Sequence, residues 1–103
     1  GFDLDFIKKI EAITNIPIVV HGGAGNIKQI MNLFKETKCD GISISSLFHY
    51  HYIFKLKNES SNKYLDEGNI DFLMKKSSLK NIESTKINTL KKFLIKKKIN
   101  CRI

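Results

Sequence analysis

The 103-residue sequence has no tryptophan, one proline, two cysteines and a single arginine among 18 basic residues. Cys39 and Cys101 lie far apart and lack the neighbouring cysteine or histidine that a zinc site requires, so neither a metal site nor a disulfide framework is predicted. No signal-peptide pattern and no apolar run of about 18 residues is present, which leaves secretion and membrane insertion without support. We therefore expect a cytoplasmic protein with inert thiols.

The scarcity of arginine also decides how the net charge of +8 is interpreted. Clustered cations suggest a nucleic-acid partner, because they displace counterions from the phosphate backbone. Specific contacts to bases and phosphates favour the arginine fork, however, and only Arg102 provides one. The lysines are spread from Lys8 to Lys98, as expected for residues that solvate helix surfaces. We expect neither nucleic acid nor a membrane as a partner.

Hydrophobic residues make up 42% of the chain and charged residues 27%, which is typical of one folded domain over residues 1–103. Apolar residues at steps of three predict an amphipathic helix over 3–13, capped by Asp3. The apolar run 16–20 predicts a parallel strand that is buried on both faces. Asn26 is positioned to cap a second helix, whose apolar stripe runs from Ile27 to Phe34.

A second strand is predicted over 41–46, where isoleucine and serine alternate. We expect the isoleucines to face helices, and Ser43 and Ser45 to face the opposite side. A helix starts at Leu47 with Ser46 near its N-terminus. A polar excursion follows at about 55–83, with one short helix capped by Asn69, and a last helix covers 84–98.

The order of helix, strand, helix, strand and helix indicates an α/β fold with a parallel sheet. Two strands cannot form a stable sheet alone, so further strands are expected upstream or from another chain. The sequence also begins at Gly1 rather than at methionine, directly before a helical pattern. It is interpreted as a piece of a longer protein.

The glycines that follow the first strand are the first part of a predicted anion-binding site. Gly22 and Gly23 lie between a strand end and a helix start, where backbone N–H groups and the helix dipole favour an anion. Ser45 and Ser46 occupy the matching place after the second strand. In (β/α)8 barrels, the loops after strands 7 and 8 often share one phosphate in this way.

These motifs resemble the last two strand-loop units of the HisF cyclase family. The opening Gly1-Phe2-Asp3 and the ending at 98–102 are similar to further parts of that family. The resemblance rests mainly on two segments, IPIVVHGGAGN at 16–26 and CDGISISSLFH at 39–49. It implies the C-terminal portion of a (β/α)8 TIM barrel, with strands 7 and 8 and their helices.

The resemblance further implies a lyase of histidine biosynthesis that forms imidazole glycerol phosphate with ammonia from a HisH-type glutaminase partner. It implies no cofactor, and assigns one phosphate of a phosphorylated small-molecule substrate to four residues: Gly22, Gly23, Ser45 and Ser46. The family's general acid and base are aspartates on the first and sixth strands, both expected before Gly1. Asp3 and Asp5 are better explained by helix capping and solvation, so the isolated chain is predicted to be inactive.

Two features depart from the family pattern. His21 stands where the family usually has a small residue, and beside the phosphate it would bind the anion when protonated, take part in acid-base chemistry, or simply pack. The excursion at 55–83 resembles HisF-like paralogues that serve acetamidino modification of surface-polysaccharide sugars, which is a second hypothesis for the substrate.

A hypothesis of another class is a non-catalytic phosphate-binding or assembly module that pairs with a complementary partial barrel. A metal site is not expected, because His49 and His51 are two positions apart on a helix and face different directions.

Overall fold

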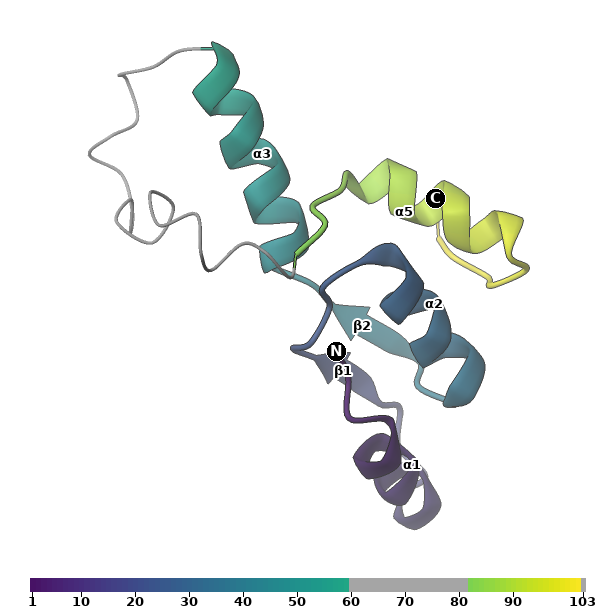
Figure 1. Ribbon diagram of the computed structural model, residues 1–103. Coiled ribbons are helices and arrows are strands. Elements are labelled where there is room, and N and C mark those ends of the chain that lie inside the picture. The colour runs from purple at the N-terminus through teal and green to yellow at the C-terminus, as the bar shows by residue number, and fades with distance from the viewer. Residues whose placement is uncertain (60–81, 103) are drawn as a thin grey trace.

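The computed structural model describes residues 1–59 and 82–102. The predicted short helix after Asn69 and most of the polar excursion lie outside these residues. The described elements alternate between helix and strand up to the third helix, and one further helix closes the chain (Figure 1). Their order is α1 (Leu4–Ile13), β1 (Val19–His21), α2 (Ile27–Glu36), β2 (Gly41–Ser43), α3 (Ser46–Glu59) and α5 (Ile87–Lys96).

Two of the three predicted helix caps, Asp3 and Asn26, lie in the described residues, and both are confirmed. The Asp3 carboxylate accepts a hydrogen bond from the Phe6 N–H at 3.0 Å, and the Asn26 side chain accepts one from the Gln29 N–H at 2.9 Å. Each cap satisfies a backbone donor that the first turn of a helix leaves without a partner, which is worth about 1 kcal/mol. These local interactions determine where α1 and α2 begin.

Strands β1 and β2 form a parallel pair in which Val20 lies opposite Ile42 and His21 opposite Ser43. Both strands are shorter than predicted. At their start, the Asp40 carboxylate accepts a hydrogen bond from the Ile18 N–H at 2.8 Å, and the Ile18 carbonyl accepts one from the Asp40 N–H at 2.9 Å. The described residues therefore have the predicted α/β class with a parallel sheet.

The prediction that the first strand is buried on both faces is wrong for the described residues. Val20 is buried, whereas Val19 is 64% exposed and His21 is also exposed. The reason is that helices cover one face of the pair, and no second layer covers the other face within residues 1–59 and 82–102. The predicted alternation in the second strand is confirmed, because Ile42 and Ile44 pack against the core and Ser43 and Ser45 are exposed.

Two apolar clusters form the core on the helix side of the sheet. Partly buried Ile42 packs against both of them, so β2 joins the two into one layer. The first cluster links α1, β1 and α2 through Ile7, Val20, Leu33 and Cys39. The second links α2, α3 and α5 through Ile30, Leu47, Leu90 and Leu94.

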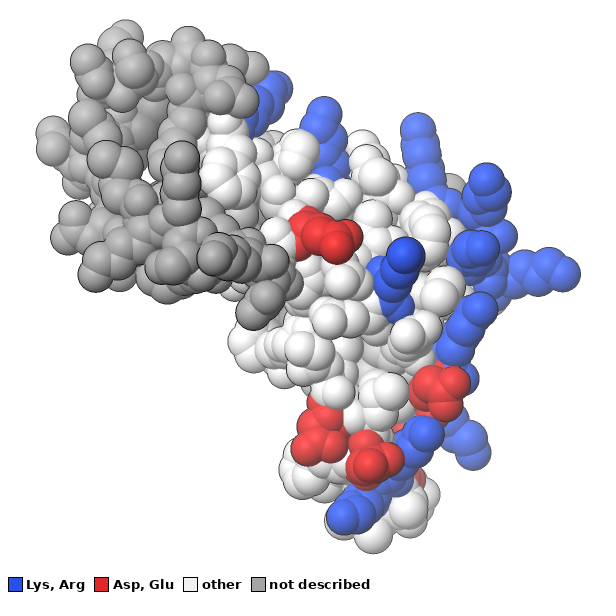
Figure 2. All heavy atoms as spheres, viewed as in Figure 1, with Lys and Arg blue, Asp and Glu red and all other residues white. Residues whose placement is uncertain are grey.

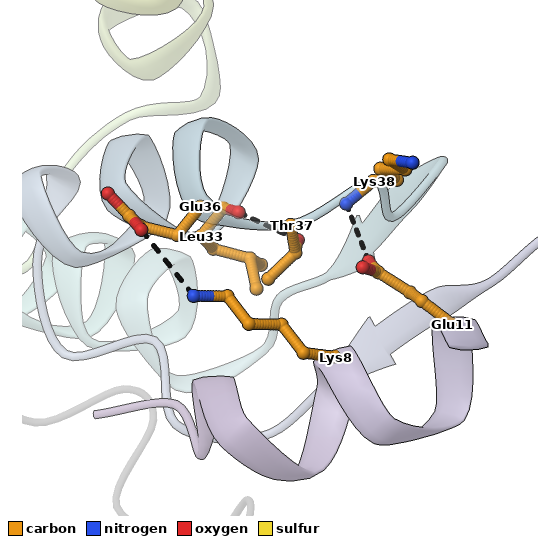
Figure 3. Close-up of polar contacts among 6 residues, drawn as sticks. All are labelled: Lys8, Glu11, Leu33, Glu36, Thr37 and Lys38. Atoms are coloured by element: carbon orange, nitrogen blue, oxygen red, sulfur yellow. Dashed lines mark hydrogen bonds and ion pairs between the residues drawn. The ribbon is translucent and has the colours of Figure 1, made fainter.

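Polar contacts hold α1 beside the end of α2 (Figure 3). Glu11 accepts a hydrogen bond from the Lys38 backbone N–H at 2.6 Å, and Lys8 forms an ion pair with Glu36 at 3.5 Å. The ion pair joins two exposed side chains and contributes little to stability. The Thr37 hydroxyl donates to the Leu33 carbonyl at 2.7 Å and closes the last turn of α2.

The outer flank of α1 and β1 carries large apolar side chains without cover. Phe6 is 59% exposed, and Ile13, the last of the apolar residues at steps of three in the first helix, is 80% exposed. Ile16 is 73% exposed. No described helix is long and apolar enough to cross a membrane.

Candidate anion-binding site

A cavity of about 320 Å³ lies at the carboxyl ends of β1 and β2. Parallel strands in α/β folds bring their following loops together at this edge, which is where such folds bind ligands. All five residues that the sequence identified line the cavity, together with three that it did not assign to the site. The lining residues are His21, Gly22, Gly23, Ala24, Ser43, Ile44, Ser45 and Ser46.

Two consecutive glycines give the first loop its conformation. Gly22 and Gly23 have φ angles of 81° and 89°, a region that other residues rarely adopt. A Cβ atom on Gly22 would meet nothing within 4 Å, whereas one on Gly23 would lie 2.5 Å from the Gly1 carbonyl oxygen. Gly22 is thus required for its dihedral angle alone, and Gly23 also for close backbone packing.

Several backbone donors at the cavity are available to a ligand. Within the part of the chain that the structure describes, no hydrogen bond to another protein group is found for the N–H groups of Gly23, Ser45 and Ser46. Gly25 differs, because its N–H donates to the Gln29 side chain at 2.8 Å. The free donors are therefore those nearest the strand ends.

The N-terminus of α3 lies at the second loop, where its partial positive charge favours an anion. The Ser45 carbonyl accepts hydrogen bonds from the N–H groups of Phe48 and His49 at 3.1 and 3.0 Å, so the helical bonding begins directly at the cavity. The first turn of a helix carries partial positive charge, which stabilises an anion. The two serine hydroxyls are further donors on the same loop.

Among the residues that the structure describes, no lysine, arginine or carboxylate lines this cavity, and His21 is the only titratable side chain in the lining. Many basic residues lie elsewhere: Figure 2 shows lysine and arginine side chains along one flank, from α5 past α2 to α1. An anion in the cavity would therefore be held by backbone dipoles and hydroxyl groups, with a positive charge only when His21 is protonated. Such a site selects an anion by geometry rather than by bulk charge.

The remaining residues with reactive side chains lie away from this site. Burial raises the pKa of the Cys39 thiol, an effect that a hydrogen bond with Thr37 partly offsets. Among residues 1–59 and 82–102, no three histidine, cysteine, aspartate or glutamate side chains lie close enough to hold a metal ion. His49 and His51 both belong to α3, and neither lines the cavity.

The sequence pattern did not identify three of the lining residues, Ala24, Ser43 and Ile44. For Ser43 a signal was present, because the alternation in the second strand places it on the same face as Ser45. Ala24 and Ile44 enter the lining only through the way the two loops approach each other.

Comparison with known proteins identifies one matching family model and several similar proteins of one kind. The family model described as histidine biosynthesis protein matches residues 1–53. The chain is 32% identical to the imidazole glycerol phosphate synthase subunit HisF of Buchnera aphidicola over 103 residues, all of this chain and 28% of that protein. It is 34% identical to HisF of Clostridium beijerinckii over 70 residues, 68% of this chain and 26% of that protein.

HisF of Streptococcus mutans is 40% identical over 50 residues, which are 48% of this chain and 20% of that protein. The chain thus spans between a fifth and about a quarter of the length of these relatives. No solved structure matches it significantly. The matched segment contains both strands, both loops and the whole lining of the cavity. The chain belongs to the histidine biosynthesis protein family, and its relatives in that family are HisF subunits of imidazole glycerol phosphate synthase.

Proposed function

We propose that this chain is the C-terminal portion of a HisF-type TIM barrel, with β1 and β2 as strands 7 and 8, and that its cavity holds one phosphate group of the substrate. The observation that carries the proposal is that the two strand-loop-helix units, both within a histidine biosynthesis match, line one cavity. The reaction is the lyase step that forms imidazole glycerol phosphate in histidine biosynthesis.

The phosphate is held chiefly by backbone groups. Gly22 and Gly23 let the first loop approach the anion without an intervening Cβ atom, and the Gly23 N–H is available as a donor. Ser45 and Ser46 add N–H and hydroxyl donors at the start of α3. Two loops that each supply donors surround a phosphate from two sides, the arrangement known for barrels of this class.

His21 is a further candidate contact for this phosphate. It lies on the last residue of β1, is exposed, and lines the cavity. A protonated imidazole would give the phosphate a charge-assisted hydrogen bond, which is roughly twice as strong as a neutral one.

The chemical step requires residues beyond this chain. Among the described residues, no carboxylate lines the cavity, so the two aspartates that the family resemblance gives as acid and base are not part of it. The exposed apolar flank at Phe6, Ile13 and Val19 supports packing against further barrel strands that carry these groups. A HisH-type glutaminase supplies ammonia to the complete enzyme, and the chain alone is inactive.

The proposal is tested by titrating the intact protein with inorganic phosphate and following the backbone amide resonances by NMR. We expect the signals of Gly23 and Ser46 to shift together with one dissociation constant. The double variant Ser45→Ala/Ser46→Ala is expected to weaken binding by about 25-fold, because two hydroxyl donors are lost and each neutral hydrogen bond contributes about 5-fold. Lys92→Gln, which removes an exposed lysine of α5 outside the cavity, is the matched control and leaves the affinity unchanged. Shifts that spread over the lysine flank and leave the loops unaffected would contradict the proposal.

The non-catalytic assembly module is a second candidate, favoured by the lack of carboxylates among the described lining residues and by the exposed flank of α1 and β1. The two candidates differ when the chain is combined with a polypeptide that supplies six barrel strands and two aspartates. Synthase activity of the mixture supports the cyclase. A stable complex that binds phosphate without turnover supports the assembly module.

A further inference from the structure

A short segment after the gap in the described chain connects the starts of two helices. The Glu83 N–H donates a hydrogen bond to the Gly25 carbonyl at 2.8 Å, and the Thr85 N–H donates one to the Leu47 carbonyl at 3.2 Å. Gly25 directly precedes the cap of α2, and Leu47 is the second residue of α3. Figure 1 shows this segment passing from the base of α3 towards α5. We call residues 82–85 the brace.

The brace is seated in the core that the two helices share. Thr85 is only 8% exposed, and Ile82 packs against the second apolar cluster. That cluster contains Ile30 from α2 and Leu47 from α3, both fully buried. A segment packed on both helices moves only when the cluster is disturbed, since interiors are close-packed.

The brace bonds at points next to the cavity but not in it. Gly25 lies two residues after Gly23, and Leu47 follows Ser46 directly. Gly25 is held on both sides, because its N–H donates to Gln29 and its carbonyl accepts from Glu83. Neither Gly25 nor Leu47 lines the cavity, so their backbone groups serve to fix the loops rather than to bind a ligand.

We propose that the brace is a positioning element that sets the distance between the two loops, so that one phosphate is contacted by both at once. This inference rests on the proposed phosphate site. Donors held at their binding positions before the ligand arrives lose less freedom on binding, and affinity increases accordingly. Without the brace, each loop would still carry its donors, but their spacing would no longer match one anion.

The test removes one bond of the brace and leaves the cavity unchanged. Glu83→Pro lacks the N–H that bonds Gly25, whereas Glu83→Ala keeps that N–H and is the matched control. Both variants are made in the intact protein and titrated with inorganic phosphate, with the Gly23 and Ser46 amide resonances followed by NMR. The control is expected to bind like the unaltered protein, and Glu83→Pro about 5-fold more weakly, the factor that corresponds to one neutral hydrogen bond.

The shape of the titration distinguishes positioning from a general loss of stability. With the brace broken, the Gly23 and Ser46 signals are expected to follow two different dissociation constants, because the loops no longer act as one site. If both signals still follow a single constant at unchanged affinity, the brace does not position the loops. If the unaltered protein shows no phosphate-dependent shift in either loop, the proposed phosphate site itself is wrong.

A measurement on the unaltered protein covers the case in which Glu83→Pro does not fold. Coupling between two sites is reciprocal, so phosphate must stabilise the brace if the brace favours phosphate binding. We expect saturating phosphate to slow hydrogen exchange of the Glu83 and Thr85 amides by about the same 5-fold factor. Exchange at these amides that does not respond to phosphate, while the loop signals do, would overturn the inference.

Discussion

The C-terminal end of helix α5 allows a quantitative prediction of how a substitution at Lys98 changes the free energy of unfolding. Lys98 has a φ angle of 62° and is, among the described residues, the only one other than glycine in the left-handed region. The Lys98 N–H donates to the Ile95 carbonyl at 2.9 Å, and the Ile99 N–H donates to the Leu94 carbonyl at 3.0 Å. This pair of bonds is the Schellman motif, in which glycine is the preferred residue at the position of Lys98.

Replacing Lys98 with glycine removes the steric cost of its left-handed backbone, which is about 1–2 kcal/mol for a residue with a Cβ atom. The gain is reduced by about 0.4–1 kcal/mol, because glycine has more conformational freedom in the unfolded state. A cation next to the negative end of the helix dipole is also lost. Lys98→Ala loses the same cation but keeps the strain, so the comparison of the two variants isolates the backbone contribution.

We expect Lys98→Gly to be more stable than Lys98→Ala by about 1 kcal/mol, measured by urea unfolding of the intact protein. This difference corresponds to roughly 4–8 °C in Tm for a domain of about 100 residues. Lys97→Gly serves as the positional control, because Lys97 has a φ angle of −92° and gains nothing from glycine. It should destabilise by about 0.5–1 kcal/mol. Equal stability of Lys98→Gly and Lys98→Ala would refute the reasoning.

Three further predictions follow from the same kind of argument. Gly22→Ala is expected to lower the unfolding free energy by about 1 kcal/mol, because alanine is strained at the positive φ of Gly22. Gly23→Ala is expected to lower it more, because the new Cβ atom would also lie 2.5 Å from a backbone oxygen. Equal losses for the two variants in urea unfolding would contradict this. Asn26→Ala should lower the unfolding free energy by about 1 kcal/mol through loss of the α2 cap, and an unchanged urea midpoint would speak against that role. Cys39 should react with a thiol reagent more slowly than half-buried Cys101 at neutral pH, because burial raises the pKa of its thiol and keeps it protonated. Its labelling, measured by mass spectrometry, should accelerate only at alkaline pH, and equal rates for the two cysteines at neutral pH would be inconsistent with its burial.

The anion site shows how far local patterns lead. Gly22 and Gly23 after one strand, and Ser45 and Ser46 after the next, could be assigned to a common edge because parallel strands place their carboxyl ends together. Their meeting in one cavity agrees with that assignment. Which donors remain for a ligand could not be predicted in this way. The bond between the Gly25 carbonyl and the Glu83 N–H exists only because a distant segment packs beside the loop.

The strands show the limit of the same reasoning. The apolar run 16–20 indicated a strand covered on both faces, but the observed strand is shorter and covered on one face, because burial depends on which elements are present to pack against it. The sequence by itself determined the helix starts at Asp3 and Asn26, the alternation of isoleucine and serine, and the family, since these depend on neighbouring residues. Tertiary structure alone decided the strand lengths and the brace between the loops, because both require contacts between segments that are far apart in the chain. It also decided the left-handed backbone of Lys98, which depends on the path of the backbone at the end of α5.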